Sequence, residues 1–206
     1  MAALVLGLLL PFSIFYLKNL IDTKIHSKSS LEKSVLNYPV LAELPRIGKN
    51  QDKILGDNDR SVLAESLRIL RTNLDYLLKS KRNTKNNNII LVTSSVSGEG
   101  KTFVSTNLSM IFASTKKKVL LIGADIRNPK IYTYFVDKNV DRMQYLKKNS
   151  NHGLSEYLFD KNVELKDLIN TMLVHNNTID VIYSGKILPN PSELFECRFH
   201  GTRQSR

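Results

Sequence analysis

Cysteine is almost absent from this chain of 206 residues, in which Cys197 is the single example. One thiol cannot form an internal disulfide framework or a zinc cluster of several thiolates, so folds stapled in those ways are excluded. Acidic residues are also few: 19 stand against 30 lysines and arginines, which leaves a net charge of +11. No aromatic-rich motif accompanies the short basic clusters, so we interpret them as solvated loops and expect no nucleic-acid partner.

Hydrophobic residues make up 42% of the chain, and residues 2–17 are an almost wholly apolar run. As a helix this run spans about 24 Å, which is short of the roughly 30 Å of a bilayer core. A signal peptide and a buried core helix are the alternatives. Lys18, Lys24 and Lys28 follow the run and would hold the downstream side in the cytoplasm. We therefore expect residues 1–20 to be the end of a transmembrane helix.

The next segment, residues 21–58, has a mixed composition. It predicts a juxtamembrane linker with one docking segment, a short strand between prolines at residues 38–45. A helix is expected from Asp59 or Ser61, either of which can cap it. Its leucines recur at spacings of three and four, which gives one apolar face. Glu65, Arg68 and Arg71 lie on the other side, where spacing alone indicates a solvated face with weak ion pairs.

Downstream, apolar runs alternate with amphipathic runs. Strands are expected at residues 89–93, 119–122 and 179–183, and helices near residues 102–114, 154–159 and 165–173. Strand–helix alternation of this kind predicts an α/β fold, a parallel sheet with helices on both faces.

The first of these strands runs into a phosphate-binding loop. Residues 95–102 read SVSGEGKT and fit the pattern G-x-x-x-x-G-K-[ST], except that Ser95 takes the first glycine position. Glycines let the backbone turn its N–H groups toward phosphate oxygens, the lysine can reach the β- and γ-phosphates, and the threonine hydroxyl can ligate Mg²⁺. The following helix adds its positive N-terminal end. The expected nucleotide contacts are Ser97, Gly98, Glu99, Gly100, Lys101, Thr102 and Phe103.

A second group of polar residues follows the strand at residues 119–122, where the chain reads GADIRNP over residues 123–129. An acid at the end of a strand that neighbours a phosphate loop can hold Mg²⁺, directly or through water. Taken alone, Asp125 and Arg127 would be an ordinary loop acid and a capping arginine. Beside Lys101 and Thr102, the role on Mg²⁺ is the one we favour.

Together these segments resemble the bacterial tyrosine kinases (BY-kinases) of capsule and exopolysaccharide assembly, over nearly the whole chain up to Phe195. The marks are the helix with Glu65, Arg68 and Arg71, the loop 97–102, and the segments 119–129, 153–158 and 184–194. The resemblance implies a P-loop tyrosine-kinase domain at residues 59–195 that binds ATP and Mg²⁺. It implies that Lys101, Asp125 and Arg127 are catalytic and that Thr102 and Asp125 position the metal. The N-terminal helix would be the last part of the polysaccharide chain-length domain with which such kinases are associated.

The same resemblance implies partners. Family members form homo-oligomeric rings in which one subunit phosphorylates tyrosines of its neighbour. Glu65, Arg68 and Arg71 resemble the ring contact. The ring would be anchored in the inner (plasma) membrane, with its kinase domain in the cytoplasm, and would act with the polysaccharide export machinery.

Three features depart from the family pattern. Many members have Asp-x-Asp-x-Arg where this chain has Gly123 in place of the first acid. The chain also shows neither a later strand ending in a Mg²⁺-binding Asp nor a C-terminal tyrosine cluster, and residues 196–206 are an atypical tail that suggests out-of-frame translation. We therefore expect an incomplete sheet in a chain truncated at both ends. Two alternatives stay open: a P-loop ATPase of the chromosome- and septum-positioning type, and a non-catalytic, ATP-binding or structural remnant of a polysaccharide co-polymerase.

Overall fold

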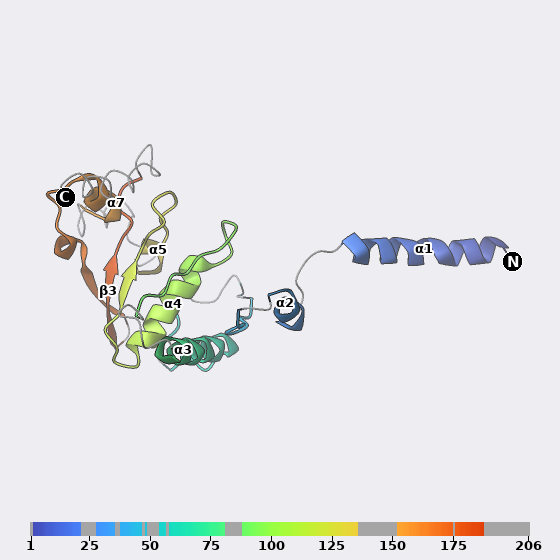
Figure 1. Cartoon of the computed structure of the whole chain (residues 1–206), viewed down its shortest axis with the longest axis horizontal. Helices are drawn as coiled ribbons and strands as arrows, with labels where there is room; N and C mark the ends of the chain where they lie inside the picture. Colours follow the sequence, from blue (N-terminus) through green and yellow to red (C-terminus); the bar gives the residue numbers. More distant parts are fainter. Residues whose placement is uncertain are drawn as a thin grey trace. The chain divides into compact units, whose positions relative to one another are not determined.

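The computed structural model describes residues 2–21, 28–35, 38–46, 48, 54–56, 58–80, 88–135, 152–174 and 176–187. The chain divides into an N-terminal unit, residues 1–43, and a C-terminal unit, residues 44–206 (Figure 1). The tail at residues 196–206 and the family mark from residue 188 onward lie outside the described residues. The expectations for those two segments therefore stay predictions.

The N-terminal unit contains two helices, α1 (Ala2–Ile21) and α2 (Lys28–Ser34). α1 takes in the whole apolar run, with Pro11 inside it. Among the residues that the structure describes, no helix combines the length and apolarity needed to cross a membrane. A helix is present where we expect one, and its membrane role stays a prediction.

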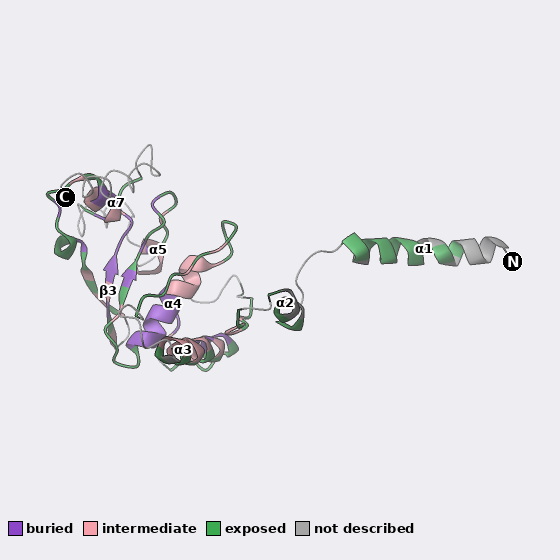
Figure 2. Ribbon diagram, in the orientation of Figure 1, coloured by how far each residue is buried: buried purple, intermediate pink, exposed green. Residues whose placement is uncertain are grey.

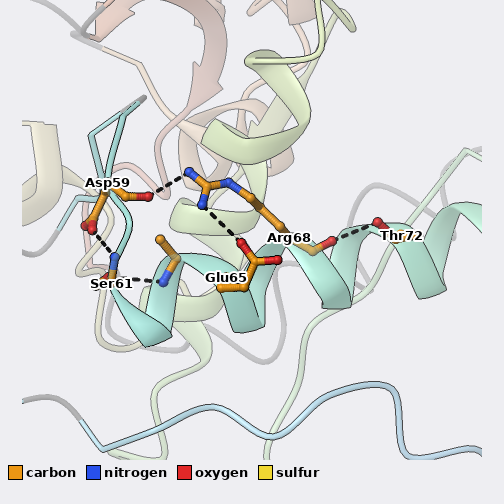
Figure 3. A network of polar contacts seen from close by, with 6 residues as sticks. Asp59, Ser61, Glu65, Arg68 and Thr72 are labelled. Carbon is orange, nitrogen blue, oxygen red and sulfur yellow. Dashed lines mark hydrogen bonds and ion pairs between the residues drawn. The ribbon is translucent and has the colours of Figure 1, made fainter.

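The C-terminal unit begins its regular structure with helix α3 (Val62–Ser80). Ser61 caps this helix, because its Oγ accepts a hydrogen bond from the Ala64 N–H at 3.2 Å (Figure 3). Asp59 supports the cap, since its Oδ1 accepts a hydrogen bond from the Ser61 N–H at 2.7 Å. Leu63 and Leu67 are buried, so the leucine face packs inward as its spacing predicts.

Part of the expected linker packs on the core of this unit. Leu55 is buried, and its N–H donates to Asn107 Oδ1 of helix α4 (Lys101–Ala113) at 2.9 Å. Residues 38–46 form no strand, contrary to the expectation. Pro39 and Pro45 lack the N–H groups that a ladder requires, which disfavours a strand there.

Three strands form one sheet in the order β1–β3–β2: β1 (Leu120–Ile122), β2 (Asn170–Val174) and β3 (Asn177–Ile182). β1 pairs with β3 in parallel, whereas β2 pairs with β3 antiparallel. The sheet is therefore mixed, and the prediction of a parallel sheet was wrong in this respect. Only residues 175 and 176 separate β2 from β3, and so short a connection requires neighbouring strands to run antiparallel.

The prediction of a helix at residues 165–173 was also wrong. Its first part is a 3₁₀ turn, η1 (Leu165–Leu168), and its second part is β2. Apolar residues recur there at helical spacing, at Leu165, Leu168, Ile169, Met172 and Leu173. Pairing with β3 overrode this periodicity, because strand formation depends on cross-strand neighbours that one segment does not reveal.

Residues 89–93, where we expected a strand, form no strand in the structure. Ile89 and Leu91 are 78% and 82% exposed. Within the described part of the chain, β3 is the only strand paired with β1, and residues 89–93 pair with neither. An apolar run becomes a strand only where a neighbour supplies cross-strand contacts, so composition alone overstated this element.

Helices lie on both faces of the sheet, as expected, but they cover the faces unequally. One face carries Leu121, Ile179 and Val181, which pack against Met110 of α4. α3 packs in turn against α4, and the buried residues follow this interface and the strands (Figure 2). The short helix α5 (Tyr132–Phe135) adds Tyr132 and Phe135 to the same core as the sheet.

On the other face of the sheet, the described residues cover the end of β3. There Ile182 packs with Val163 and Leu168, beside helix α7 (Leu154–Phe159). Leu120 and Ile122, on the same face, are 44% and 48% exposed. Because Ile122 lies beside Ile182 in the parallel register, the cover on this face lies over the end of β3 and does not extend across β1.

Candidate nucleotide-binding site

The phosphate loop ends in two glycines that need a left-handed backbone. Gly98 has φ +93°, and Gly100, which caps α4, has φ +95°. Residues with a side chain rarely adopt such angles. A Cβ added at either position would meet nothing within 4 Å. Backbone conformation, not crowding, therefore requires glycine here, and the space beside both residues is open.

The first turn of α4 presents unsatisfied donors. Gly100 has no side chain to accept from them, and the first hydrogen bond of the helix runs from the Val104 N–H to the Gly100 carbonyl at 2.9 Å. The N–H groups of Lys101, Thr102 and Phe103 thus have no acceptor within the helix. Free N–H groups at the positive end of a 13-residue helix fit an anion such as a phosphate.

Glu99 lies within the loop, but its carboxylate turns back onto the loop itself. Glu99 Oε2 accepts a hydrogen bond from the Val96 N–H at 3.2 Å. The Val96 carbonyl accepts in turn from Ser94 Oγ at 2.9 Å. Glu99 therefore supports the shape of the loop, and Ser97 between these residues is exposed.

The first three side chains of α4, which follow Gly100, differ in their surroundings. Lys101 is half-buried and forms no ion pair with any described residue, so its ammonium is available to a ligand. Thr102 is half-buried beside it. Phe103 packs against the core cluster of α3 and α4. This contact anchors the first turn of α4 and with it the loop.

Asp125 and Arg127 follow β1. The parallel pairing continues past the strand, because the Gly123 N–H donates to the Ile182 carbonyl at 2.8 Å. Asp125 is exposed, and its Oδ1 accepts a hydrogen bond from the Asn128 N–H at 2.9 Å. Arg127 is exposed. This loop and the phosphate loop both lie toward the upper end of the C-terminal unit in Figure 1.

The donor set suits Mg²⁺ held together with a nucleotide. Among the described residues, no group of three or more His, Cys, Asp or Glu side chains could hold a metal alone. Mg²⁺ is usually bound by one or two carboxylates plus substrate phosphates, and it prefers oxygen ligands. Thr102 and Asp125 each offer an oxygen of this kind, so the chemistry of both side chains suits a Mg²⁺ ion that arrives with ATP.

The tyrosines after this loop are partly buried. Tyr132 packs against the main core, and burial raises the pKa of Tyr134 above its ordinary value of 10.0. Tyr145 lies outside the described residues. Tyr132 thus serves packing, and Tyr134 is half-buried beside it.

The three charged residues of α3 differ in their surroundings. Arg68 is bound within its own chain: one nitrogen lies 3.4 Å from Glu65 Oε2, and the other donates to the Asp59 carbonyl at 2.8 Å (Figure 3). Arg71 Nε is buried and has no hydrogen-bond partner among the described residues. The local ion pair that spacing predicts is present for Glu65 and Arg68, while Arg71 keeps an unmet donor.

Sequence reasoning gave no role to a polar cluster beside the Asp125 loop. Glu156 of α7 accepts hydrogen bonds from the Gly153 N–H at 2.7 Å and from the Lys186 N–H at 3.1 Å. Ser155 donates to the Ser184 carbonyl at 2.7 Å. The two glycines near this cluster, Gly153 and Gly185, are the sequence signal that could have pointed to it. In the structure they lie so close together that a Cβ on Gly153 would be 2.3 Å from the Gly185 Cα.

Comparison with known proteins gives this geometry a family context. Residues 90–184 match the family model described as the CobQ/CobB/MinD/ParA nucleotide binding domain. Tyrosine-protein kinase etk of Escherichia coli (strain K12) is 35% identical over 148 residues, which cover 71% of this chain and 18% of that protein. Tyrosine-protein kinase ptk of Acinetobacter johnsonii is 30% identical over 203 residues, which cover 92% of this chain and 25% of that protein.

Solved structures agree with the sequence matches. The kinase domain of Escherichia coli tyrosine kinase ETK superposes with a TM-score of 0.66 at 31% identity, over 88% of this chain and 67% of that domain. This chain thus spans a quarter or less of the two curated relatives and about two thirds of the solved kinase domain. Because the likeness to that domain covers most of this chain in both sequence and fold, the chain belongs to the bacterial tyrosine kinases (BY-kinases).

Proposed function

We propose that this chain carries the ATP-binding part of an autophosphorylating protein-tyrosine kinase that regulates capsular or exopolysaccharide biosynthesis and export. The observation that carries the proposal is the start of α4. Gly98 and Gly100 keep the loop in a left-handed conformation with open space beside it. The N–H groups of the first helical turn have no acceptor within the helix, and such groups bind phosphate.

Each residue of the site has a task in this proposal. ATP bound with Mg²⁺ would supply the phosphoryl group that is transferred to a tyrosine. The free N–H groups and the Lys101 ammonium neutralise phosphate charge by charge-assisted hydrogen bonds. The Thr102 hydroxyl and the Asp125 carboxylate would hold Mg²⁺, and Arg127 would add positive charge at the same loop as Asp125. Since residue 123 is glycine, Asp125 is the acid that residues 123–129 offer.

We propose further that a second copy of the chain docks on α3 in a homo-oligomeric ring. Support comes from Arg71, which is half-buried and forms no ion pair with any described residue. A carboxylate from a neighbouring subunit would pair with the accessible part of its guanidinium, whereas Arg68 already has partners in its own chain. The apolar N-terminal run would anchor this ring in the inner membrane beside the export machinery, with the kinase domain in the cytoplasm and tyrosines of the neighbouring subunit as substrates.

Replacement of Lys101 by methionine tests the nucleotide site. A charge-assisted hydrogen bond contributes about 1.5–3 kcal/mol, so Lys101→Met should weaken binding of a fluorescent ATP analogue by roughly 10- to 150-fold. ATP-dependent phosphotyrosine, detected by antibody or mass spectrometry, should disappear. Lys118→Met is the matched control, because Lys118 is an exposed lysine between α4 and β1.

The outcomes separate the candidate functions. Phosphotyrosine that survives Lys101→Met, or binding lost equally in Lys118→Met, would contradict the proposal. Nucleotide binding without phosphotyrosine in the unmodified chain would favour a non-catalytic remnant, which the missing acid at residue 123 supports. ATP hydrolysis without phosphotyrosine would favour an ATPase of the chromosome- and septum-positioning type.

A further inference from the structure

The loop that carries Asp125 is fastened at its first residue. Gly123 is buried, and its N–H donates to the Ile182 carbonyl at 2.8 Å. Its own carbonyl accepts a hydrogen bond from Ser184 Oγ at 2.7 Å. Both backbone polar groups of Gly123 are therefore held by the end of β3 and the residues directly after it.

Ser184 is itself fixed from the opposite side. It is 4% exposed, and its carbonyl accepts two hydrogen bonds from Ser155 of α7, from Oγ at 2.7 Å and from the N–H at 2.9 Å. The Glu156 carboxylate joins the start of α7 to the chain just beyond Ser184 through the Gly153 and Lys186 N–H groups. Ser184 thus belongs to a rigid assembly of α7 and the end of β3.

From Gly123 to Asp125 the loop has little freedom. The Ala124 N–H donates to the Ile122 carbonyl at 3.1 Å, and the Ile126 N–H donates to the Ala124 carbonyl at 3.1 Å. Ile126 is buried against Leu158 of α7. The backbone of Asp125 is therefore held between Gly123 on one side and Ile126 on the other, and its carboxylate accepts from the Asn128 N–H.

We propose that Ser184 is a positioning residue for Asp125: its hydroxyl fixes the start of the loop so that the Asp125 carboxylate meets Mg²⁺ of the bound nucleotide. This inference rests on the proposed nucleotide site and adds to it a residue 61 positions away in sequence from Gly123. Residues that hydrogen-bond behind a metal ligand fix its orientation, and their loss weakens metal affinity.

The contact also constrains residue 123. A Cβ at this position would lie 2.9 Å from Ser184 Oγ and 3.2 Å from Ser184 N. Any side chain there requires the contact to shift. Gly123→Ala therefore disturbs the same hydrogen bond from the other side while leaving the Ser184 hydroxyl in place.

The experiment measures how Mg²⁺ supports binding of a fluorescent ATP analogue to the full chain. Ser184→Ala should raise the Mg²⁺ concentration for half-maximal binding on the order of tenfold, with Gly123→Ala changing it in the same direction. Asp125→Asn gives the reference for loss of the carboxylate. Ser155→Ala is the matched control: it removes a buried 2.7 Å hydrogen bond from the same assembly, yet the Ser155 N–H still holds the Ser184 carbonyl.

Thermal unfolding of each variant separates positioning from stability. The inference requires Ser184→Ala and Ser155→Ala to lower the unfolding temperature similarly while only Ser184→Ala changes the Mg²⁺ requirement. An equal change in both, or none in either, would overturn it. If Ser184→Ala does not fold, Gly123→Ala decides by the same comparison. Failure of the unmodified chain to bind nucleotide at all would instead overturn the proposed function, and the inference with it.

Discussion

Glu99 places a negative charge inside a loop whose task is to hold phosphate. Its carboxylate accepts a hydrogen bond from the Val96 N–H, which an amide oxygen could also do. Glu99→Gln should therefore preserve the loop and remove repulsion toward the nucleotide. We expect about two- to fivefold tighter binding of an ATP analogue at low salt, with the gain shrinking as salt screens the charge.

Glu99→Ala is the companion variant, because it removes both the charge and the acceptor for Val96. Its binding should be weaker than that of Glu99→Gln if the hydrogen bond shapes the loop. Equal affinity of the two variants in a salt titration would show that the contact to Val96 has no part in nucleotide binding.

At this scale, the phosphate loop could be predicted from sequence because its chemistry is local. Glycines, lysine and threonine within eight residues specify one backbone shape and one charge. The Ser184–Gly123 hydrogen bond joins residues 61 apart, and the Ser155–Ser184 bond joins residues 29 apart. No periodicity or motif in a single sequence encodes which serine faces which carbonyl, so these positioning contacts required the structure.

Among the elements, α3 depends on its cap. Ser61 Oγ satisfies the Ala64 N–H, one of the donors that the first turn leaves without an intrahelical partner. Ser61→Ala should lower the free energy of unfolding by about 1 kcal/mol, measured by urea denaturation. Ser61→Asp keeps an acceptor at the same place and should retain most of the stability. Equal losses in both variants would indicate that the serine matters for some reason other than capping.

Helices were more predictable than strands for a physical reason. The leucine spacing of α3 and the boundaries of α7 depend on side chains within one segment, and the structure confirms both helices. β2 and the run at residues 89–93 depend on partners elsewhere. The first has β3 beside it and became a strand against its helical spacing, whereas the second has no partner among the described residues and did not.

In the C-terminal unit as a whole, one face of the sheet is buried more completely than the other, so side chains on that face should contribute more to the free energy of unfolding. Successive side chains of β1 point to opposite faces of the sheet, so substitutions at neighbouring residues test the two faces separately. Leu121 is 6% exposed and packs with Met110 and Val181 on the face that α4 covers. Leu120 is 44% exposed on the opposite face, where the residues of α7 and η1 cover the end of β3. An uncovered apolar face also favours association with other molecules.

Paired substitutions in β1 test this arrangement. Leu121→Ala removes a buried side chain and should lower the free energy of unfolding by about 2–5 kcal/mol in urea denaturation. Leu120→Ala should cost less than about 1 kcal/mol, since nearly half of that side chain already meets solvent. Leu120→Lys should in addition reduce aggregation, followed by light scattering, because it places charge on the open face. Similar losses for Leu120→Ala and Leu121→Ala would contradict the one-sided core and would mean that another segment covers the second face in solution.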